Sequence, residues 1–317
     1  MTARPAKTWR VGPDDVRTLE RPLVMGIVNA TPDSFSDGGT HVNPDVAIDA
    51  GRAMLAAGAD IIDVGGESTR PGAERVDADE QIRRTLPIVA GIARSIDHRP
   101  GGPLISIDTT LAAVAAAAVD AGAGIINDVS AGVDDPAVFT LAAERRCALV
   151  LMHRARRPED DQYSDRYTDA PGYACVDADV AAWLAARISV AVNAGCDAEQ
   201  LAVDPGFGFG KSVADNYALI AGTAVEALGR PVLHGSSRKS FIGAVTGRSE
   251  PRDRGAGSLA AALAHVDRGA NLLRVHDVAS MVDALAVREA VRAASRTEQT
   301  EAARLADRRR RPAAESS

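Results

Sequence analysis

The sequence predicts a single (β/α)8 barrel of the TIM-barrel type. Eight short apolar runs recur along the chain, segments with helical periodicity lie between them, and each run is followed by polar residues. Strands that alternate with helices predict parallel βαβ units. Polar residues at the carboxyl ends of such strands predict an active site, because the barrel loops converge there. A doubly wound open sheet is the competing architecture, but its ligand binds at one switch point rather than at eight equivalent strand ends.

The eight predicted strands are distinguished by the polar residues that follow them. They are 24–28 before Asn29, 61–62 before Asp63, 104–107 before Asp108, 125–126 before Asn127-Asp128, 148–151 before Met152-His153, 201–203 before Asp204, 232–233 before the 236–239 segment, and 272–275 before His276. Only 3% of the residues are aromatic, so branched aliphatic side chains must fill the core, as they do in barrel layers.

Helices are expected between these strands. Asn43-Pro44 is typical of an N-cap followed by proline at the first helical position, and Gly58 supplies the stop. Asp135-Pro136 repeats this start. Further helices are expected near residues 78–97, 111–121, 177–194, 213–228, 255–268 and 279–294.

The repeat fills most of the chain without interruption. No Pro-rich or Gly-rich linker divides it, so we expect one barrel domain over residues 21–295 of the 317. Residues 1–20 are then an N-terminal extension. Residues 296–317, which include the arginine run 308–311, are expected to form a disordered C-terminal tail in solvent.

Composition narrows the classes of function. Hydrophobic residues make up 46% of the chain, charged residues 25%, and the net charge is −7. Such an acidic balance argues against nucleic acid or a membrane surface as the main partner. No apolar run is long enough for a membrane helix or a signal segment, so we expect a cytoplasmic protein. The three cysteines form no metal-binding or disulfide pattern, and Cys147 is interpreted as a small core residue.

Two loops follow the first two predicted strands. The first, 29–39, contains Asp33 and Phe35, and the second, 65–72, combines glycines with the single cation Arg70. We interpret them as lids that close over an anionic substrate. Two long surface connections without a function are the alternative.

Four residues at strand ends have complementary hydrogen-bonding roles. Asp108 and Asp204 accept, Asn127 does both, and Lys239 donates. A pterin ring presents donors beside a carbonyl acceptor, so this set could satisfy its edge. Each residue alone is more often a cap or part of a buried salt bridge.

The last predicted strand carries Arg274 and His276 in alternation with apolar residues. A period of two directs both side chains into the barrel. Phosphate sites in barrels often form near the last strands, so we expect both residues to bind oxyanions. A core histidine with a backbone partner is the alternative for His276.

The glycine-rich segment 206–212 is neither of two common phosphate-binding motifs. A P-loop would need glycine at Pro205, and the dinucleotide motif would need it at Lys211. These glycines are expected to let the backbone approach a planar ligand, with Phe207 or Phe209 packed nearby. H-E-x-x-H and G-x-S-x-G are absent from the sequence, which argues against zinc proteases and α/β-hydrolases.

Together these residues resemble the dihydropteroate synthases over about residues 22–290. The segments that carry the resemblance are 29–39, 63–72, 106–109, 126–130, 204–211, 237–241 and 274–278. Members of that family are transferases of folate biosynthesis. They condense 4-aminobenzoate with (7,8-dihydropterin-6-yl)methyl diphosphate and release 7,8-dihydropteroate and diphosphate.

The resemblance assigns a role to each matching residue. The pterin would be held by Asp108, Asn127, Met152, Asp204, Phe209 and Lys239. The diphosphate would be held by Asn29, Thr69, Arg70, Arg274 and His276, and 4-aminobenzoate by Phe35, Thr69, Pro71 and Ser240. The catalytic residues would be Asp33, Arg70, Lys239, Arg274 and His276. Asn29 would also bind Mg²⁺, which takes its other ligands from phosphate and water.

The resemblance further implies an S_N1-like displacement and a homodimer. Mg²⁺, Arg274 and His276 would stabilise the departing diphosphate, and Asp33 would stabilise the cationic pterin methylene. The two loops would close in order over the substrates.

The sequence departs from the family pattern at two places. Residues 154–158 read Arg-Ala-Arg-Arg-Pro where the family commonly has Met-Arg-Gly, and an acidic, tyrosine-containing loop follows at 159–173. Asp215-Asn216 stands where His-Asn is frequent. Neither change touches the residues expected to bind the pterin or the anion, so activity should survive.

Three other functions compete with this interpretation. A folate-dependent methyltransferase would not need Arg70 or the 237–240 segment. A non-catalytic pterin-binding paralogue would not need Asp33 or His276. An aldolase-type barrel would use Lys239 as a Schiff-base nucleophile, which borohydride trapping would reveal.

Overall fold

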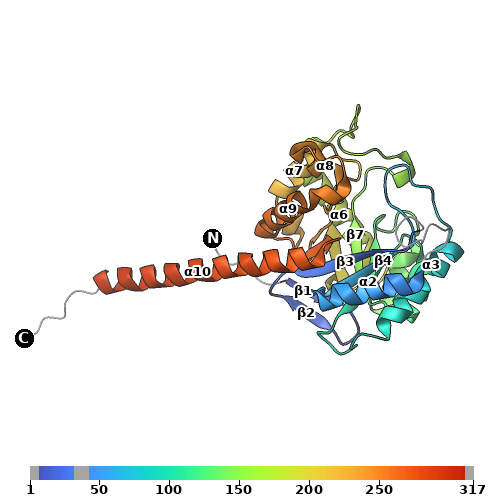
Figure 1. Cartoon of the computed structure of the whole chain (residues 1–317), viewed down its shortest axis with the longest axis horizontal. Helices are drawn as coiled ribbons and strands as arrows, with labels where there is room; N and C mark the ends of the chain where they lie inside the picture. The colour runs from blue at the N-terminus through green and yellow to red at the C-terminus, as the bar shows by residue number, and fades with distance from the viewer. Residues whose placement is uncertain (1–6, 32–42, 311–317) are drawn as a thin grey trace, which may run out of the picture.

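The computed structural model of the chain describes residues 7–31 and 43–310 (Figure 1). Its main sheet has eight parallel strands in the order β8-β7-β6-β5-β4-β3-β10-β9. A parallel bridge between Val203 and Val232 joins the two ends of this row. The sheet is therefore a nearly closed barrel, as the sequence predicts.

All eight predicted strands are present among the described residues. They are β3 (Leu23–Asn29), β4 (Ile61–Gly65), β5 (Leu104–Asp108), β6 (Ile125–Asp128), β7 (Ala148–Met152), β8 (Leu201–Asp204), β9 (Leu233–His234) and β10 (Leu272–Val275). Neighbouring strands pair in register, with Asp108 opposite Asn127 and Met152 opposite Asp204. Polar strand ends therefore lie side by side at one mouth of the barrel.

Helices follow the strands closely where the sequence predicts them. They are α2 (Pro44–Ala56), α3 (Ala78–Ala93), α4 (Ala112–Asp120), α5 (Ala137–Arg145), α6 (Val176–Asn193), α7 (Val213–Ala221), α8 (Ser240–Thr246), α9 (Gly255–Arg268) and α10 (Val278–Arg310). Short 3-10 turns are η1 (Pro158–Asp160), η2 (Ala198–Gln200), η3 (Glu226–Leu228) and η4 (Pro251–Arg254). Asn43 caps α2 by accepting from the Asp45 amide at 3.0 Å, and Gly58 beyond its end has a φ of 97°.

Three details of the helices differ from the prediction. The helix expected over 213–228 ends at Ala221, and only the η3 turn follows it. The short helix α8 was not predicted. Helix α10 continues to Arg310 and extends away from the barrel (Figure 1), beyond residue 295 where we expected a disordered tail to begin. Residues 278–310 contain neither glycine nor proline, which would interrupt a helix.

The N-terminal extension is not separate from the barrel. Strands β1 (Lys7–Arg10) and β2 (Val16–Leu19) form an antiparallel hairpin. Trp9 belongs to this hairpin and is fully buried. Its side chain packs in a cluster with Leu23 and Met25 at the amino ends of the strands. Its indole N–H donates to the Gln200 carbonyl at 3.0 Å. The hairpin therefore covers the floor of the barrel.

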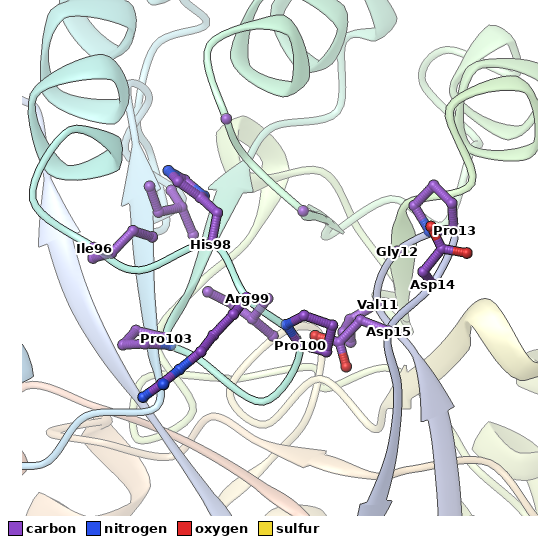
Figure 2. Close-up of a pocket in the computed structure, with 14 residues that line it drawn as sticks. Val11, Gly12, Pro13, Asp14, Asp15, Ile96, His98, Arg99, Pro100 and Pro103 are labelled. Atoms are coloured by element: carbon purple, nitrogen blue, oxygen red, sulfur yellow. The ribbon is translucent and has the colours of Figure 1, made fainter.

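A cavity of about 390 Å³ lies beside this hairpin (Figure 2). Val11 and Asp15 line it from the hairpin, and Leu104 and Gly124 line it from the amino ends of β5 and β6. It is therefore at the opposite end of the strands from the predicted site.

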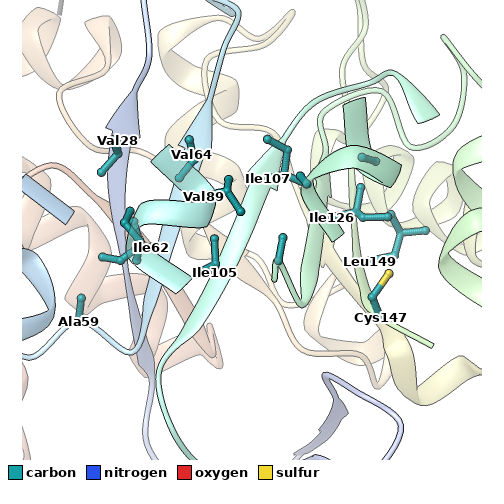
Figure 3. Close-up of a cluster of buried hydrophobic side chains, with 14 of the residues drawn as sticks. Val28, Ala59, Ile62, Val64, Val89, Ile105, Ile107, Ile126, Cys147 and Leu149 are labelled. Carbon is teal, nitrogen blue, oxygen red and sulfur yellow. The ribbon is translucent and has the colours of Figure 1, made fainter. Parts of the chain in front are cut away.

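The apolar core lies mostly between the sheet and the helices. Ile62, Val64, Ile105 and Ile107 point outward from their strands against residues such as Val89 of α3 (Figure 3). Cys147 packs in the same cluster, as predicted. Because side chains alternate along a strand, the residues between these point into the barrel. None of the helices in the described part of the chain is long and apolar enough to cross a membrane.

Candidate active site

Arg274 lies between two buried carboxylates inside the barrel. Its Nε donates to Asp63 Oδ2 at 2.6 Å, and its Nη2 donates to Asp108 Oδ2 at 2.7 Å. Asn127 Nδ2 also donates to Asp63 Oδ2, at 3.2 Å. The inward direction predicted for Arg274 is thus confirmed by its contacts. Asp63 was noted in the sequence only as the end of a strand, yet it connects Asn127 with Arg274.

The carboxylates of this group are strongly desolvated. Burial raises the pKa of Asp108, and the nearby Arg274 guanidinium opposes the rise. Burial raises the pKa of Asp204 to about 6, although the Gly206 amide donates to its Oδ1 at 2.6 Å. Within the described residues, Asp63 Oδ1 and Ser106 Oγ are buried without a hydrogen-bond partner. Buried polar atoms normally have hydrogen-bond partners, so we expect a water or a ligand to bind to these two atoms.

An apolar wall adjoins these polar residues. Val129, Met152 and Phe209 form a small buried cluster. Lys239 Nζ lies 4.0 Å from the centre of the Phe209 ring. Desolvation lowers the pKa of Lys239 to about 8, helped by Arg274, while Asp204 and Asp108 raise it. The site thus has one polar edge and one apolar face, which matches a flat polar heterocycle.

The glycines of the 206–212 segment allow close contacts within the protein itself. Gly206, Gly208 and Gly210 all have positive φ. A Cβ on Gly206 would overlap the His153 carbonyl, and one on Gly210 would come within 2.5 Å of Ala155. The glycines therefore let this segment approach the protein's own chain. Phe207 does not border the site: its ring packs 4.7 Å from that of His234 in the core.

Lys211 is a buried cation to which the sequence gave no role. Its Nζ lies 2.9 Å from the Gly206 carbonyl, 3.0 Å from the Phe209 carbonyl and 2.9 Å from His153 Nδ1. Three acceptors match the three donors of an ammonium group. Burial lowers the pKa of Lys211 to about 7, and Asp204 opposes this. Lys211 holds the loop that carries Phe209.

His276 stands at the end of β10 beside Ser237. Ser237 Oγ lies 3.0 Å from His276 Nδ1 and accepts from the His276 amide at 3.3 Å. The pKa of His276 is lowered to about 3. Burial is the largest cause, and the charges of Arg238, Arg274, Lys239 and Arg70 lower the pKa further. The imidazole is therefore neutral near neutral pH. If the Ser237 hydroxyl donates to Nδ1, the ring proton lies on Nε2, the nitrogen left for a ligand.

A chain of buried hydrogen bonds lies behind the 236–240 segment. Glu226 Oε1 is 2.6 Å from His265 Nε2, the two Nδ1 atoms of His265 and His234 are 2.9 Å apart, and His234 Nε2 is 2.5 Å from Ser236 Oγ. All four residues are buried. This chain joins η3, α9 and β9 beneath the segment that carries Lys239.

The remaining predicted residues lie at or near the mouth. Asn29 is half-buried at the end of β3, and Ser240 is buried at the first position of α8. Thr69 and Pro71 are half-buried in the second loop, and Arg70 is exposed there. Asp33 and Phe35 lie outside the described residues. In the ranges that the structure does describe, His, Cys, Asp and Glu nowhere form a group of three that could hold a metal.

Comparison with known proteins identifies the family. The model of the pterin-binding enzymes matches residues 25–276. The dihydropteroate synthase of Escherichia coli K12 is 41% identical over 284 residues, which cover 89% of this chain and 96% of that protein. A probable bifunctional folylpolyglutamate synthase/dihydropteroate synthase of Haloferax volcanii is 45% identical over 288 residues, and the chain spans 33% of its length.

Solved structures agree with the sequence relatives. Dihydropteroate synthase of Xanthomonas albilineans with 4-aminobenzoic acid superposes with a TM-score of 0.80 at 46% identity, covering 91% of this chain and 99% of that one. The same enzyme in complex with 7,8-dihydropteroate gives a TM-score of 0.75 at 45% identity, with 88% and 97% covered. The chain therefore belongs to the pterin-binding enzymes and, among them, to the dihydropteroate synthases.

Proposed function

We propose that this chain condenses 4-aminobenzoate with (7,8-dihydropterin-6-yl)methyl diphosphate and releases 7,8-dihydropteroate and diphosphate. The observation that carries the proposal is the buried polar edge of Asp108, Asn127 and Asp204 beside the apolar wall of Met152 and Phe209. Relatives of the same fold hold 4-aminobenzoic acid and 7,8-dihydropteroate.

The pterin fits this site through its edge and its face. The ionised carboxylates of Asp108 and Asp204 would accept from the amino group and ring N–H donors, and Asn127 would complete the edge. Lys239, held above Phe209, would donate to the ring carbonyl or a ring nitrogen. A pterin in this place would also meet the hydrogen-bonding needs of buried polar atoms, which otherwise cost about 1–3 kcal/mol each.

The diphosphate would bind at the mouth, where Asn29, Thr69, Arg70, Arg274 and His276 are proposed to hold it. Burial lowers the pKa of His276, and four nearby cations lower it further; the positive field of these cations favours an anion. A neutral His276 would donate from Nε2 to a phosphate oxygen. Arg274 already uses Nε and Nη2 on Asp63 and Asp108, so it would act as a fixed charge more than as a free clamp.

Asn29 fits the need of a Mg²⁺ ion at this position. It is half-buried at the carboxyl end of β3 and offers an amide oxygen, a donor type that Mg²⁺ accepts. Mg²⁺ usually keeps several waters and takes substrate phosphates, so one protein oxygen is enough. When bound, the ion would supply positive charge to the departing diphosphate.

The reaction then requires a good leaving group more than a strong nucleophile. The C–O bond to diphosphate breaks first, and the pterin shares the positive charge of its methylene, which Asp33 would stabilise. Preorganised partners of the leaving group are worth about 2.7–4 kcal/mol each. The 4-aminobenzoate nitrogen then forms the C–N bond and loses a proton. Phe35, Thr69, Pro71 and Ser240 would enclose its ring and carboxylate.

We also propose a homodimer that uses the helices near the C-terminus. Val287 and Val291 lie one turn apart on α10 and are 66% and 62% exposed. Exposed apolar side chains at this spacing favour a helix partner. Light scattering in solution would measure the mass directly.

Release of diphosphate from the pterin substrate tests the proposed function. The assay is run with and without 4-aminobenzoate, and with Mg²⁺ or EDTA. We expect release coupled to 7,8-dihydropteroate and lost on chelation. Release of diphosphate without formation of 7,8-dihydropteroate when 4-aminobenzoate is present, or pterin binding without any release, would reject the proposal.

A further inference from the structure

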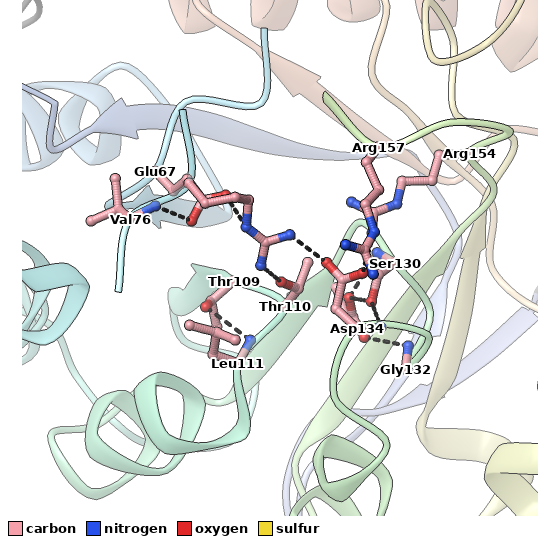
Figure 4. Close-up of polar contacts among 12 residues, drawn as sticks. Glu67, Val76, Thr109, Thr110, Leu111, Ser130, Gly132, Asp134, Arg154 and Arg157 are labelled. Atoms are coloured by element: carbon pink, nitrogen blue, oxygen red, sulfur yellow. Dashed lines mark hydrogen bonds and ion pairs between the residues drawn. The ribbon is translucent and has the colours of Figure 1, made fainter. Parts of the chain in front are cut away.

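The second loop continues from 65–72 to residue 77, where α3 is capped, and a group of charged side chains fixes this longer segment to its surroundings (Figure 4). Arg75 Nη1 lies 2.8 Å from Asp134 Oδ2, its Nε lies 3.2 Å from Glu67 Oε1, and its Nη2 donates to Thr110 Oγ1 at 3.2 Å. This loop carries Thr69, Arg70 and Pro71. Arg75 thus anchors the loop from a point close to those residues.

Asp134 is the centre of this group. Its carboxylate is only 4% exposed and meets Arg154 at 2.5 Å, Arg75 at 2.8 Å and Arg157 at 3.9 Å. Burial opposes its ionisation, but hydrogen bonds from Arg154 and Arg75 outweigh burial and lower the pKa of Asp134. Its amide donates to Ser130 Oγ at 3.2 Å. An ionised, buried carboxylate therefore joins the loops after β4, β6 and β7.

Glu67 secures the base of the same loop. Its Oε2 accepts from Gln81 Nε2 at 2.7 Å and from the Val76 amide at 3.2 Å. Gln81 Oε1 in turn accepts from Thr109 Oγ1 at 2.9 Å. Arg75 is thus held between a carboxylate on its own loop and Asp134 across the mouth.

The segment that departs from the family pattern reaches both sides of the mouth. The Pro158 carbonyl accepts from the Gly72 amide at 2.8 Å, at the tip of the second loop. On the other side, Asp161 Oδ2 accepts from the Gly210 amide at 2.9 Å, and Tyr173 donates to the Gly210 carbonyl at 2.9 Å. Gly210 adjoins Phe209 of the apolar wall. Segment 154–173 therefore links the second loop with the Phe209 loop.

We propose that Asp134 is a positioning residue that sets the place of the second loop through Arg75 and of the 154–158 segment through Arg154. Removing its charge releases the loop and weakens the binding of 4-aminobenzoate more than that of the pterin. The distinction follows because Asp134, Arg75 and Arg154 have no described hydrogen bond or ion pair with Asp108, Asn127 or Asp204. The inference about binding rests on the proposed function, whereas the inference about the loop does not.

Asp134→Asn tests the loop without any substrate. Freed Arg75 becomes a trypsin site at the Arg75–Val76 bond, whereas the Arg70–Pro71 bond resists trypsin. We expect cleavage at Arg75, followed by mass spectrometry, to become about five- to tenfold faster, as expected for a coupling of ordinary size. Hydrogen exchange of the Gly72 amide should accelerate as well. Asp120→Asn, which breaks the exposed pair with Arg145, is the matched control and should change neither rate.

Steady-state kinetics of the same variants test the effect on binding. We expect the KM for 4-aminobenzoate to rise about five- to tenfold in Asp134→Asn, with the Kd for a pterin that carries no diphosphate little changed. Asp134→Glu should recover part of the loss. Arg75→Gln removes the contact from the loop's side; it lacks the cleavage site, so its Gly72 exchange rate and its KM for 4-aminobenzoate test the proposal if Asp134→Asn does not fold.

The positioning role of Asp134 and the proposed condensation activity can fail independently of each other. Unchanged cleavage and exchange in a folded variant overturn the positioning role, and so do equal losses of affinity for 4-aminobenzoate and for a pterin that carries no diphosphate. A wild-type chain that shows no condensation rejects the proposed function, while the cleavage and exchange rates still report on Asp134.

Discussion

At the scale of single residues, the site is a set of charges that hold one another in place. Arg274 uses Nε on Asp63 and Nη2 on Asp108, and these contacts hold both carboxylates toward the barrel interior. A buried pair of this kind is costly to break, because the remaining charge has no solvent. Its value to the enzyme is therefore geometric: the pterin edge is preformed before the substrate arrives.

The pH dependence of pterin binding is set by the two buried carboxylates at the pterin edge. Burial raises the pKa of Asp108 to about 7 and that of Asp204 to about 6 in the folded protein, so each becomes protonated below its pKa and no longer accepts two donors. We expect kcat/KM for the pterin diphosphate to begin to fall below about pH 7 and to fall more steeply below about pH 6, where both carboxylates are protonated. A profile over about pH 5 to 8 at saturating 4-aminobenzoate measures it, and a flat acid limb would contradict it.

The raised pKa of Asp204 affects the stability of the empty protein in the opposite direction from pterin binding. A raised carboxyl pKa means that the folded state binds the proton more tightly than the unfolded state. The contribution of Asp204 to stability is therefore present at low pH and is lost as the pH rises through about 6. Binding of the pterin and stability of the empty protein thus favour different ends of the same pH range.

At the scale of elements, the loop after β8 depends on close contacts rather than on a ligand. Lys211 gathers three acceptors of this loop and of His153. The left-handed glycines allow the approach. The loop should therefore keep its shape in the empty enzyme, with Phe209 already in place.

Gly206→Ala should destabilise the protein far more than Gly229→Ala. Both glycines have similar positive φ, 71° and 74°, so both substitutions carry about 1–2 kcal/mol of backbone strain. Only at Gly206 does the new Cβ also meet the His153 carbonyl, whereas nothing lies within 4 Å at Gly229. Urea unfolding of both variants compares them. Equal losses would show that the close contact costs nothing.

The sequence predicts the strands and helices better than it predicts the side-chain contacts between them. Each barrel strand is recognisable because an apolar run ends in polar residues, and this local pattern found all eight. The sequence could not decide between Phe207 and Phe209 as the residue near the site, because the partners of Phe207, His234 and His265, come from distant elements. Asp134 carries no local signal either, since its partner Arg75 is 59 residues away. Contacts between residues so far apart in the sequence become visible only in the folded structure.

At the scale of the whole molecule, the hairpin packs against the floor of the barrel and shares a hydrophobic cluster with it. Trp9 joins the floor cluster from a segment that the sequence placed outside the barrel. The short strands β1 and β2 follow no barrel periodicity, which is why the pattern missed them. The proposed barrel domain therefore begins at the hairpin in structural terms.

Trp9→Ala should cost about 3–5 kcal/mol of unfolding free energy, as for other large buried side chains. Trp9→Phe should cost less, because it keeps most of the packing and loses only the hydrogen bond to Gln200. Val16 on the same hairpin is 44% exposed, so Val16→Ala should change the unfolding free energy by no more than about 0.5 kcal/mol. Calorimetry or urea titration measures all three, and a small effect at Trp9 would show that the hairpin folds independently.

The buried chain from Glu226 to Ser236 can exist in two opposite polarities. With Glu226 ionised and both imidazoles neutral, each donor points toward the carboxylate, and the Ser236 hydroxyl donates to His234. One additional proton on Glu226 reverses every bond, since His265 must then accept from Glu226 and donate to His234, and His234 must donate to Ser236. The hydroxyl hydrogen beneath the Lys239 segment is thereby tied to the charge of a carboxyl group three side chains away.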